Sequence, residues 1–153
     1  MKGHIFQINH SNGGVPKFPI FTSDVNEYGL ISDIHNDMNH HGGLDRAICL
    51  YSLELILKLQ KEGNHIFPGS IGENITTTNV DFNLFQPGRI AKFGNDLILE
   101  VTSFTTPCST IKSSFKNDYF NRISHDLNPG WSRVNCKVIK LGTINTSDLI
   151  EII

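Results

Sequence analysis

Alternation of hydrophobic and polar positions dominates the chain and predicts a series of short β-strands. The pattern is clearest over residues 97–102, where leucine, leucine and valine occupy every second position, as on a strand with one buried face. Similar stretches predict further strands over residues 4–9, 15–20, 21–31, 47–51, 89–93, 132–140 and from 149 onward. Turn signals at Asn12-Gly13-Gly14 and Gly94-Asn95 predict that two pairs of these strands form hairpins.

One stretch has a clear helical pattern. Ser52 is a natural N-cap, Ile56 and Leu57 lie on one apolar face, and Gly63 supplies a C-terminal stop. We therefore expect a helix over Ser52–Glu62 that packs outside the strands. The predicted fold class is mainly β, either a β-barrel or a β-rich α+β domain.

Cys108 is the residue whose position packing explains least. It follows the strand over residues 97–102 and the polar turn Thr105-Thr106-Pro107, and a short helix is expected to begin just after it, capped by Ser109 or Thr110. A thiol at a helix start meets unpaired backbone N–H groups, which favour the thiolate, and Lys112 would add positive charge. The alternative is that Cys108 is a small buried hydrophobe.

The other two cysteines fit that alternative better. Cys49 lies in the apolar run of residues 47–51, and Cys136 shares a strand face with Val134 and Val138. We therefore expect both to be buried packing residues, and Cys108 to be the reactive thiol.

Length and charge exclude several classes of protein. The chain has 153 residues, which fits a single domain over 1–153, and its net charge of −2 offers no general attraction for nucleic acid or an anionic membrane. Three cysteines without paired spacing argue against a disulfide framework. No apolar run is long enough to cross a bilayer and no secretion signal is evident, so a cytoplasmic protein is expected.

Residues 33–46 form a polar, histidine-rich stretch broken by Gly42-Gly43, and two functional hypotheses compete for it. Imidazole and carboxylate side chains in this stretch could bind zinc or iron. Alternatively, the glycines let the backbone approach a ligand to which His41 and Arg46 donate hydrogen bonds. The simplest alternative is a solvated loop. The candidate metal ligands are His35, Asp37, His40 and His41.

Several segments taken together resemble the MOSC domain, the family related to the C-terminal part of molybdenum cofactor sulfurases. The resemblance runs from about Gly13 to Asp148 and is closest to the small stand-alone bacterial type. Its landmarks are, in order, His41-Gly42-Gly43 with Asp45, Arg46 and Ala47; Phe67-Pro68-Gly69; Gly72-Glu73-Asn74; Pro107-Cys108; and Pro129-Gly130-Trp131-Ser132-Arg133-Val134.

The resemblance implies a MOSC-like closed β-barrel with short peripheral helices, and a molybdenum cofactor (Mo-molybdopterin). The essential cysteine of similar proteins maps onto Cys108, which would either ligate molybdenum or carry a persulfide sulfur. Some relatives reduce N-hydroxylated bases and amidoximes with electrons from a flavin- or iron–sulfur-containing partner. The residues expected to bind the cofactor are His41, Gly42, Gly43, Arg46, Gly72, Glu73, Asn74, Lys112 and Arg133.

Three hypotheses follow for the function. The first is a molybdenum-dependent reductase or oxo-transfer enzyme in which Cys108 is the metal ligand. The second is a sulfur or cofactor carrier that uses a Cys108 persulfide received from a sulfur donor. The third is a hydrolase with a metal bound in the histidine-rich loop. Under the first two, Gly42-Gly43, Gly72-Glu73-Asn74 and Cys108 should converge on one cleft.

Overall fold

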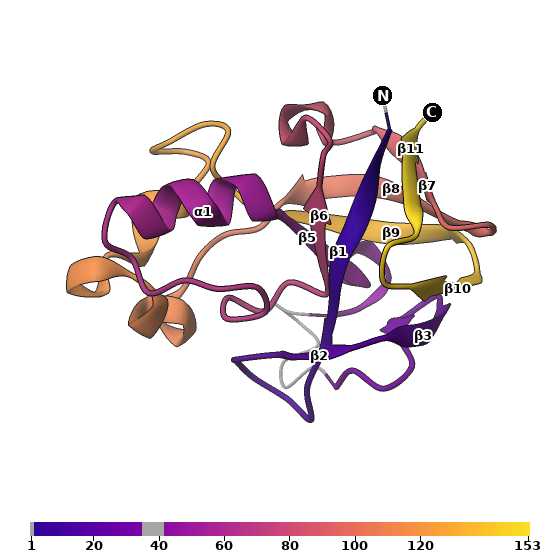
Figure 1. Ribbon diagram of the computed structural model, residues 1–153, viewed down its shortest axis with the longest axis horizontal. Coiled ribbons are helices and arrows are strands. Elements are labelled where there is room, and N and C mark those ends of the chain that lie inside the picture. The colour runs from indigo at the N-terminus through magenta and orange to yellow at the C-terminus, as the bar shows by residue number, and fades with distance from the viewer. Residues whose placement is uncertain (1, 35–41) are drawn as a thin grey trace.

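The computed structural model describes residues 2–34 and 42–153 (Figure 1). The strands are β1 (Lys2–His10), β2 (Phe18–Ile20), β3 (Thr22–Asn26), β4 (Gly29–Leu30), β5 (Ile48–Ser52), β6 (Ile75–Thr78), β7 (Ile90–Phe93), β8 (Leu97–Phe104), β9 (Val134–Lys140), β10 (Gly142–Asn145) and β11 (Leu149–Ile152). The helices are α1 (Leu53–Lys61) and the short 3-10 helices η1 (Leu44–Arg46), η2 (Phe82–Leu84), η3 (Ser109–Ser114), η4 (Lys116–Asp118) and η5 (Phe120–Ile123).

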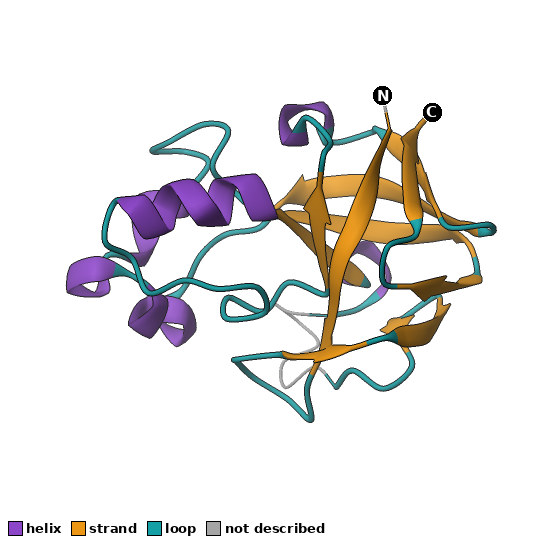
Figure 2. Cartoon of the chain, viewed as in Figure 1, coloured by secondary structure: helices purple, strands orange, loops and turns teal. Residues whose placement is uncertain are grey.

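Within the described residues, seven strands close into a barrel (Figure 2). They are hydrogen-bonded in the order β11-β7-β8-β9-β5-β6-β1, and β1 pairs with β11 to complete the ring. In that last pair Lys2 lies opposite Glu151 and His4 opposite Leu149. The predicted closed β-barrel is therefore confirmed, and pairing all round the ring leaves it without a free edge.

The side-chain pattern of the barrel strands follows the predicted period of two. On β8, Leu97, Leu99 and Val101 are buried, while the residues between them are partly exposed. Strands β7 and β8 form the predicted hairpin, with Phe93 opposite Leu97. The interior is filled by aliphatic and aromatic side chains, which supply most of the free energy that stabilises a domain of this size.

The predicted helix is present as α1. The Ser52 hydroxyl accepts a hydrogen bond from the Leu55 N–H, as an N-cap does, and Gly63 takes a positive φ just after the helix. The helix lies beside the barrel, next to η4 and η5 in Figure 1, and it contributes to the crossover between the parallel strands β5 and β6. Its role is structural.

Two strands were not predicted from the sequence. Residues 75–78 form β6, which pairs with β1 and β5. Residues 142–145 form β10, which pairs with β3 in a small separate sheet (Figure 2). Both strands are four residues long, and β6 consists of Ile75 and three threonines, so neither shows a complete alternation.

Candidate functional site

A cavity of about 150 Å³ lies on the side of the barrel away from the chain termini. Its walls come from the loop after β1, the segment before β5, the loop before β6, the turn after β8 and the start of β9. Of the residues predicted to form a site, the lining includes Arg46, Gly72, Asn74, Cys108 and Arg133. Segments that are far apart in the sequence therefore meet here.

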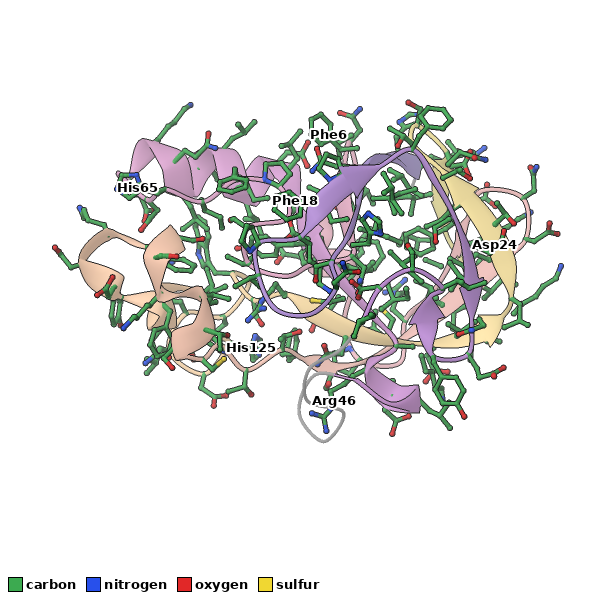
Figure 3. The ribbon with its side chains drawn as sticks, turned by 90° about the horizontal axis from the view of Figure 1, so that it is seen from below. Phe6, Phe18, Asp24, Arg46, His65 and His125 are labelled. Atoms are coloured by element: carbon green, nitrogen blue, oxygen red, sulfur yellow. The ribbon has the colours of Figure 1, made fainter. Side chains whose placement is uncertain are left out.

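Some of the predicted residues do not line the cavity. Gly43 sits at the N-cap of η1 and is not among the lining residues, nor is Gly42, whereas Arg46 at the end of that helix is. Figure 3 shows the Arg46 side chain at the edge of the molecule, directed outward, which makes it a rim residue. Lys112 is exposed on η3 and does not line the cavity, because η3 turns that face to solvent.

Cys108 is held at the cavity by the residues around it. Pro107 and Ile111 are buried on either side of it, so the backbone is anchored before and after the half-buried thiol. Its Sγ lies 2.9 Å from the Thr110 hydroxyl. The expected cap by Ser109 or Thr110 is not formed: Cys108 itself is the N-cap residue of η3, which is a 3-10 helix.

The loop from Gly69 to Asn74 forms the opposite wall and is fixed by hydrogen bonds along its length. The Gly69 N–H donates to the Glu73 carboxylate (3.1 Å), and Arg133 Nη1 donates to the Ile71 carbonyl (2.7 Å). Asn74 is joined to Cys49 in both directions, through its own N–H and through its side-chain oxygen. This wall is therefore built in place, which suits a binding surface.

Glu73 was predicted to contact a cofactor, but its side chain is fully buried behind the cavity wall. Oε2 accepts hydrogen bonds from the Gly69 N–H and from the Thr76 hydroxyl (3.0 Å). Burial raises the pKa of Glu73 to about 7, while these hydrogen bonds and the charge of Arg133 act in the opposite direction. Glu73 therefore organises the loop and does not line the cavity.

This raised pKa predicts how stability depends on pH. The ordinary pKa is 4.5, so folding favours the protonated form, and the stability that it gives is lost as pH rises from there through about 7. Glu73→Gln cannot ionise and should lack this loss. Relative to the wild type, its free energy of unfolding should rise by roughly 3 kcal/mol between pH 5 and pH 8, measured by urea unfolding. Parallel pH curves for the two proteins would contradict the assignment.

Lys17 and Asp33 form a buried ion pair at the cavity that the sequence did not reveal. Lys17 Nζ lies 2.7 Å and 2.6 Å from the two carboxylate oxygens of Asp33, and the side chains are only 9% and 1% exposed. Asp33 also accepts hydrogen bonds from the Ser11 N–H and from the Asn74 amide, both 2.9 Å. Lys17 lines the cavity, so this network of hydrogen bonds connects the loop after β1 to Asn74 in the loop before β6.

Arg133 supplies positive charge at the cavity. Its side chain is only 6% exposed, and its Nε has no hydrogen-bond partner among the described residues. A guanidinium group in the wall of a cavity is suited to hold an anionic group of a ligand. Because the chain carries a net charge of −2, attraction of an anion must come from such local groups.

The prediction that Cys49 is a buried packing residue is wrong. Cys49 is half-buried, and it lines the same cavity as Cys108. Its Sγ lies 3.8 Å from the Thr105 hydroxyl. Surrounding protein atoms raise the pKa of the Cys49 thiol, and Arg133 opposes this effect. Cys136, by contrast, is fully buried as predicted.

The proposed metal ligands His35, Asp37, His40 and His41 lie outside the described residues. Within residues 2–34 and 42–153, no three histidine, cysteine or acidic side chains gather as a metal site would require. The same part of the chain contains no helix that is long and apolar enough to cross a membrane.

Comparison with known proteins gives matches to sequence families and to solved structures. A family model for the MOSC domain matches residues 37–151. A curated protein named "Reductase" from Gibberella moniliformis is 31% identical over 140 residues, which cover 88% of this chain and 24% of that protein. The chain thus spans about a quarter of that relative's length.

Two solved structures have the same fold. The YuaD protein from Bacillus subtilis superposes with a TM-score of 0.80 at 20% identity, covering 99% of this chain and 96% of that one. YiiM from Geobacillus stearothermophilus superposes with a TM-score of 0.77 at 20% identity, covering 99% and 75% of the two chains.

Proposed function

The chain belongs to the MOSC domain family, and from this membership and the cavity we propose that it binds a molybdenum–pterin cofactor with Cys108 as the ligand to the metal. The observation that carries the proposal is that the Cys108 thiol and the buried Arg133 side chain line one cavity. Thiolate is a soft donor that suits molybdenum, and Arg133 suits the phosphate of the pterin.

Different residues of the cavity would contact different parts of the cofactor and the substrate. Cys108 would hold the metal on the side of η3, and Arg133 would hold the phosphate. Gly72 and Asn74 would contact the pterin from the wall that their hydrogen bonds fix. When bound, the cofactor would supply two-electron redox chemistry for the reduction of N-hydroxylated substrates. Arg46 on the rim is the residue best placed to meet a substrate that enters.

The electrons would come from a partner that carries flavin or an iron–sulfur cluster. The name of the curated relative supports a reductase, and its length leaves room for further segments beside the part that matches this chain. The molybdenum cofactor, the reaction and the partner are all parts of this proposal.

A second function uses the same thiol. In a sulfur carrier, Cys108 would bear a persulfide and no turnover would occur on the domain. The presence of a second thiol, Cys49, in the cavity favours this candidate, because sulfur can pass between neighbouring thiols. The two candidates differ in what the purified protein should contain.

Metal and sulfur analysis of the protein made in a host that synthesises the molybdenum cofactor separates the candidates. We expect molybdenum at about one per chain and reduction of an amidoxime with a chemical electron donor. Persulfide without molybdenum would replace this proposal with the sulfur carrier. Zinc or iron in place of molybdenum would support the hypothesis of a hydrolase with a metal bound in the histidine-rich loop.

A further inference from the structure

Two buried groups beside the cavity each have one atom without a hydrogen-bond partner. In the described residues these are Oε1 of Glu73, which is fully buried, and Nε of Arg133, which is 6% exposed. Both groups hold the loop from Gly69 to Asn74, Glu73 through the Gly69 N–H and Arg133 through the Ile71 carbonyl. Leaving buried polar atoms unpaired is costly, so the described residues do not fully satisfy either charged group, and of the two only Arg133 also lines the cavity.

The two groups also interact through their charges. Arg133 is the cation that favours the ionised form of Glu73, and it does so without forming a direct ion pair among the described residues. Besides Arg133, two titratable groups in the described part of the chain, Cys49 and Tyr51 on β5, have pKa values that the charge of Glu73 raises. Both have raised pKa values because of burial, so they stay neutral when Glu73 ionises.

We propose that an oxyanion that binds beside Arg133 brings about the uptake of a proton at Glu73. The inference rests on the anion-binding part of the proposed function and adds its regulation. The bound anion would offset the positive charge that favours the Glu73 carboxylate, and it would place negative charge near a group that is fully buried. The neutral carboxyl group is then the more stable form.

The coupling between anion binding and protonation of Glu73 makes the affinity for the anion depend on pH. Because the pKa of Glu73 is raised to about 7 before an anion binds, a large part of the protein carries an ionised Glu73 at neutral pH. Binding then requires a proton, and affinity for the anion falls as pH rises. By linkage, the affinity falls by at most about tenfold for each pH unit over which one proton per anion is taken up.

Sulfate is a suitable probe because its charge does not change over this range. The dissociation constant of sulfate would be measured across it by titration calorimetry on the full chain without cofactor. Repeating the titration near pH 7.5 in two buffers with different heats of ionisation counts the protons taken up. We expect weaker binding at higher pH and net uptake of a fraction of a proton per sulfate.

Two variants locate the effect. Glu73→Gln should bind sulfate with no pH dependence and no proton uptake, and Arg133→Met should lose sulfate binding. Should Glu73→Gln fold poorly, the carbon-13 signal of the Glu73 carboxyl in the wild type gives its protonation with and without sulfate. The proposal is overturned if sulfate does not bind, if it binds equally well to Arg133→Met, or if no proton enters at Glu73. Loss of sulfate binding in Arg133→Met tests the anion site that the proposed function shares, whereas proton uptake at Glu73 tests this inference alone, and neither result depends on molybdenum.

Discussion

Replacing Cys108 with serine is expected to abolish amidoxime reduction and to leave the barrel intact. The thiol is half-buried at the cavity, and its Sγ is paired only with the Thr110 hydroxyl in the described structure, so little packing is lost. The free energy of unfolding should change by less than about 0.5 kcal/mol. Turnover should fall to background, because a hydroxyl cannot replace a soft thiolate as a ligand to molybdenum.

The other cysteines provide matched controls. Cys136 is fully buried in the barrel, so Cys136→Ser should cost roughly 1–3 kcal/mol of stability while the folded fraction remains active. Cys49→Ser should cost less, because that thiol borders the cavity and has the Thr105 hydroxyl nearby. Alkylation should modify Cys108 first, since burial raises the pKa of the Cys49 and Cys136 thiols.

Two results would contradict this assignment. Retention of cofactor-dependent activity by Cys108→Ser would exclude the thiol as the metal ligand. Faster alkylation of Cys49 than of Cys108 would make Cys49 the more reactive thiol of the cavity.

Breaking the Lys17–Asp33 pair from either side should cause a large loss of stability. Lys17→Met removes an ammonium group that pairs with a carboxylate only 1% exposed, and Asp33→Leu removes the carboxylate from a lysine only 9% exposed. Removing one partner of a buried ion pair typically costs about 3–5 kcal/mol. For a chain of this length that corresponds to a fall in the melting temperature of roughly 10 °C, measured by calorimetry or circular dichroism.

Two controls show that the cost comes from the unpaired charge. The double variant Lys17→Met/Asp33→Leu should lose much less stability than the sum of the single variants, because no lone charge remains. Lys2→Met breaks the exposed Lys2–Glu151 pair, whose side chains are 65% and 47% exposed, and should have almost no effect. Additive losses in the double variant would show that the charges do not stabilise each other.

The parts of the fold that the sequence predicted correctly are those governed by local rules. The alternation over residues 97–102 was sufficient for β8, and the Ser52 hydroxyl and Gly63 marked the ends of α1. Local features, a strand that ends in a polar turn, predicted only that Cys108 is a reactive thiol, and its position beside a cavity was expected from the cofactor hypotheses. Closure of the barrel was expected from the family resemblance and not from any local pattern.

What the sequence missed depends on contacts between distant segments. Lysine side chains are usually exposed. Lys17 is buried because it forms an ion pair with Asp33, which lies sixteen residues later in the chain. Cys49 lies between the buried Ile48 and Leu50, so its neighbours suggested packing. Its side chain lies on the opposite face of β5 from theirs and lines the cavity, and the loop that ends in Asn74 pairs with its backbone there. No pattern along the chain records that pairing.

The pairing of β1 with β11 determines from where another protein module could be attached. Lys2 and Glu151 are opposite each other in the ring, so the two ends of the domain emerge side by side, whereas β1 runs from there to the loop that borders the cavity. Nine residues of strand span roughly 30 Å. An electron-donating module tethered at either end would therefore need a linker of about ten extended residues to swing round the barrel and reach the cavity mouth. A shorter linker would hold such a module on the side of the barrel where the termini lie, away from the cavity.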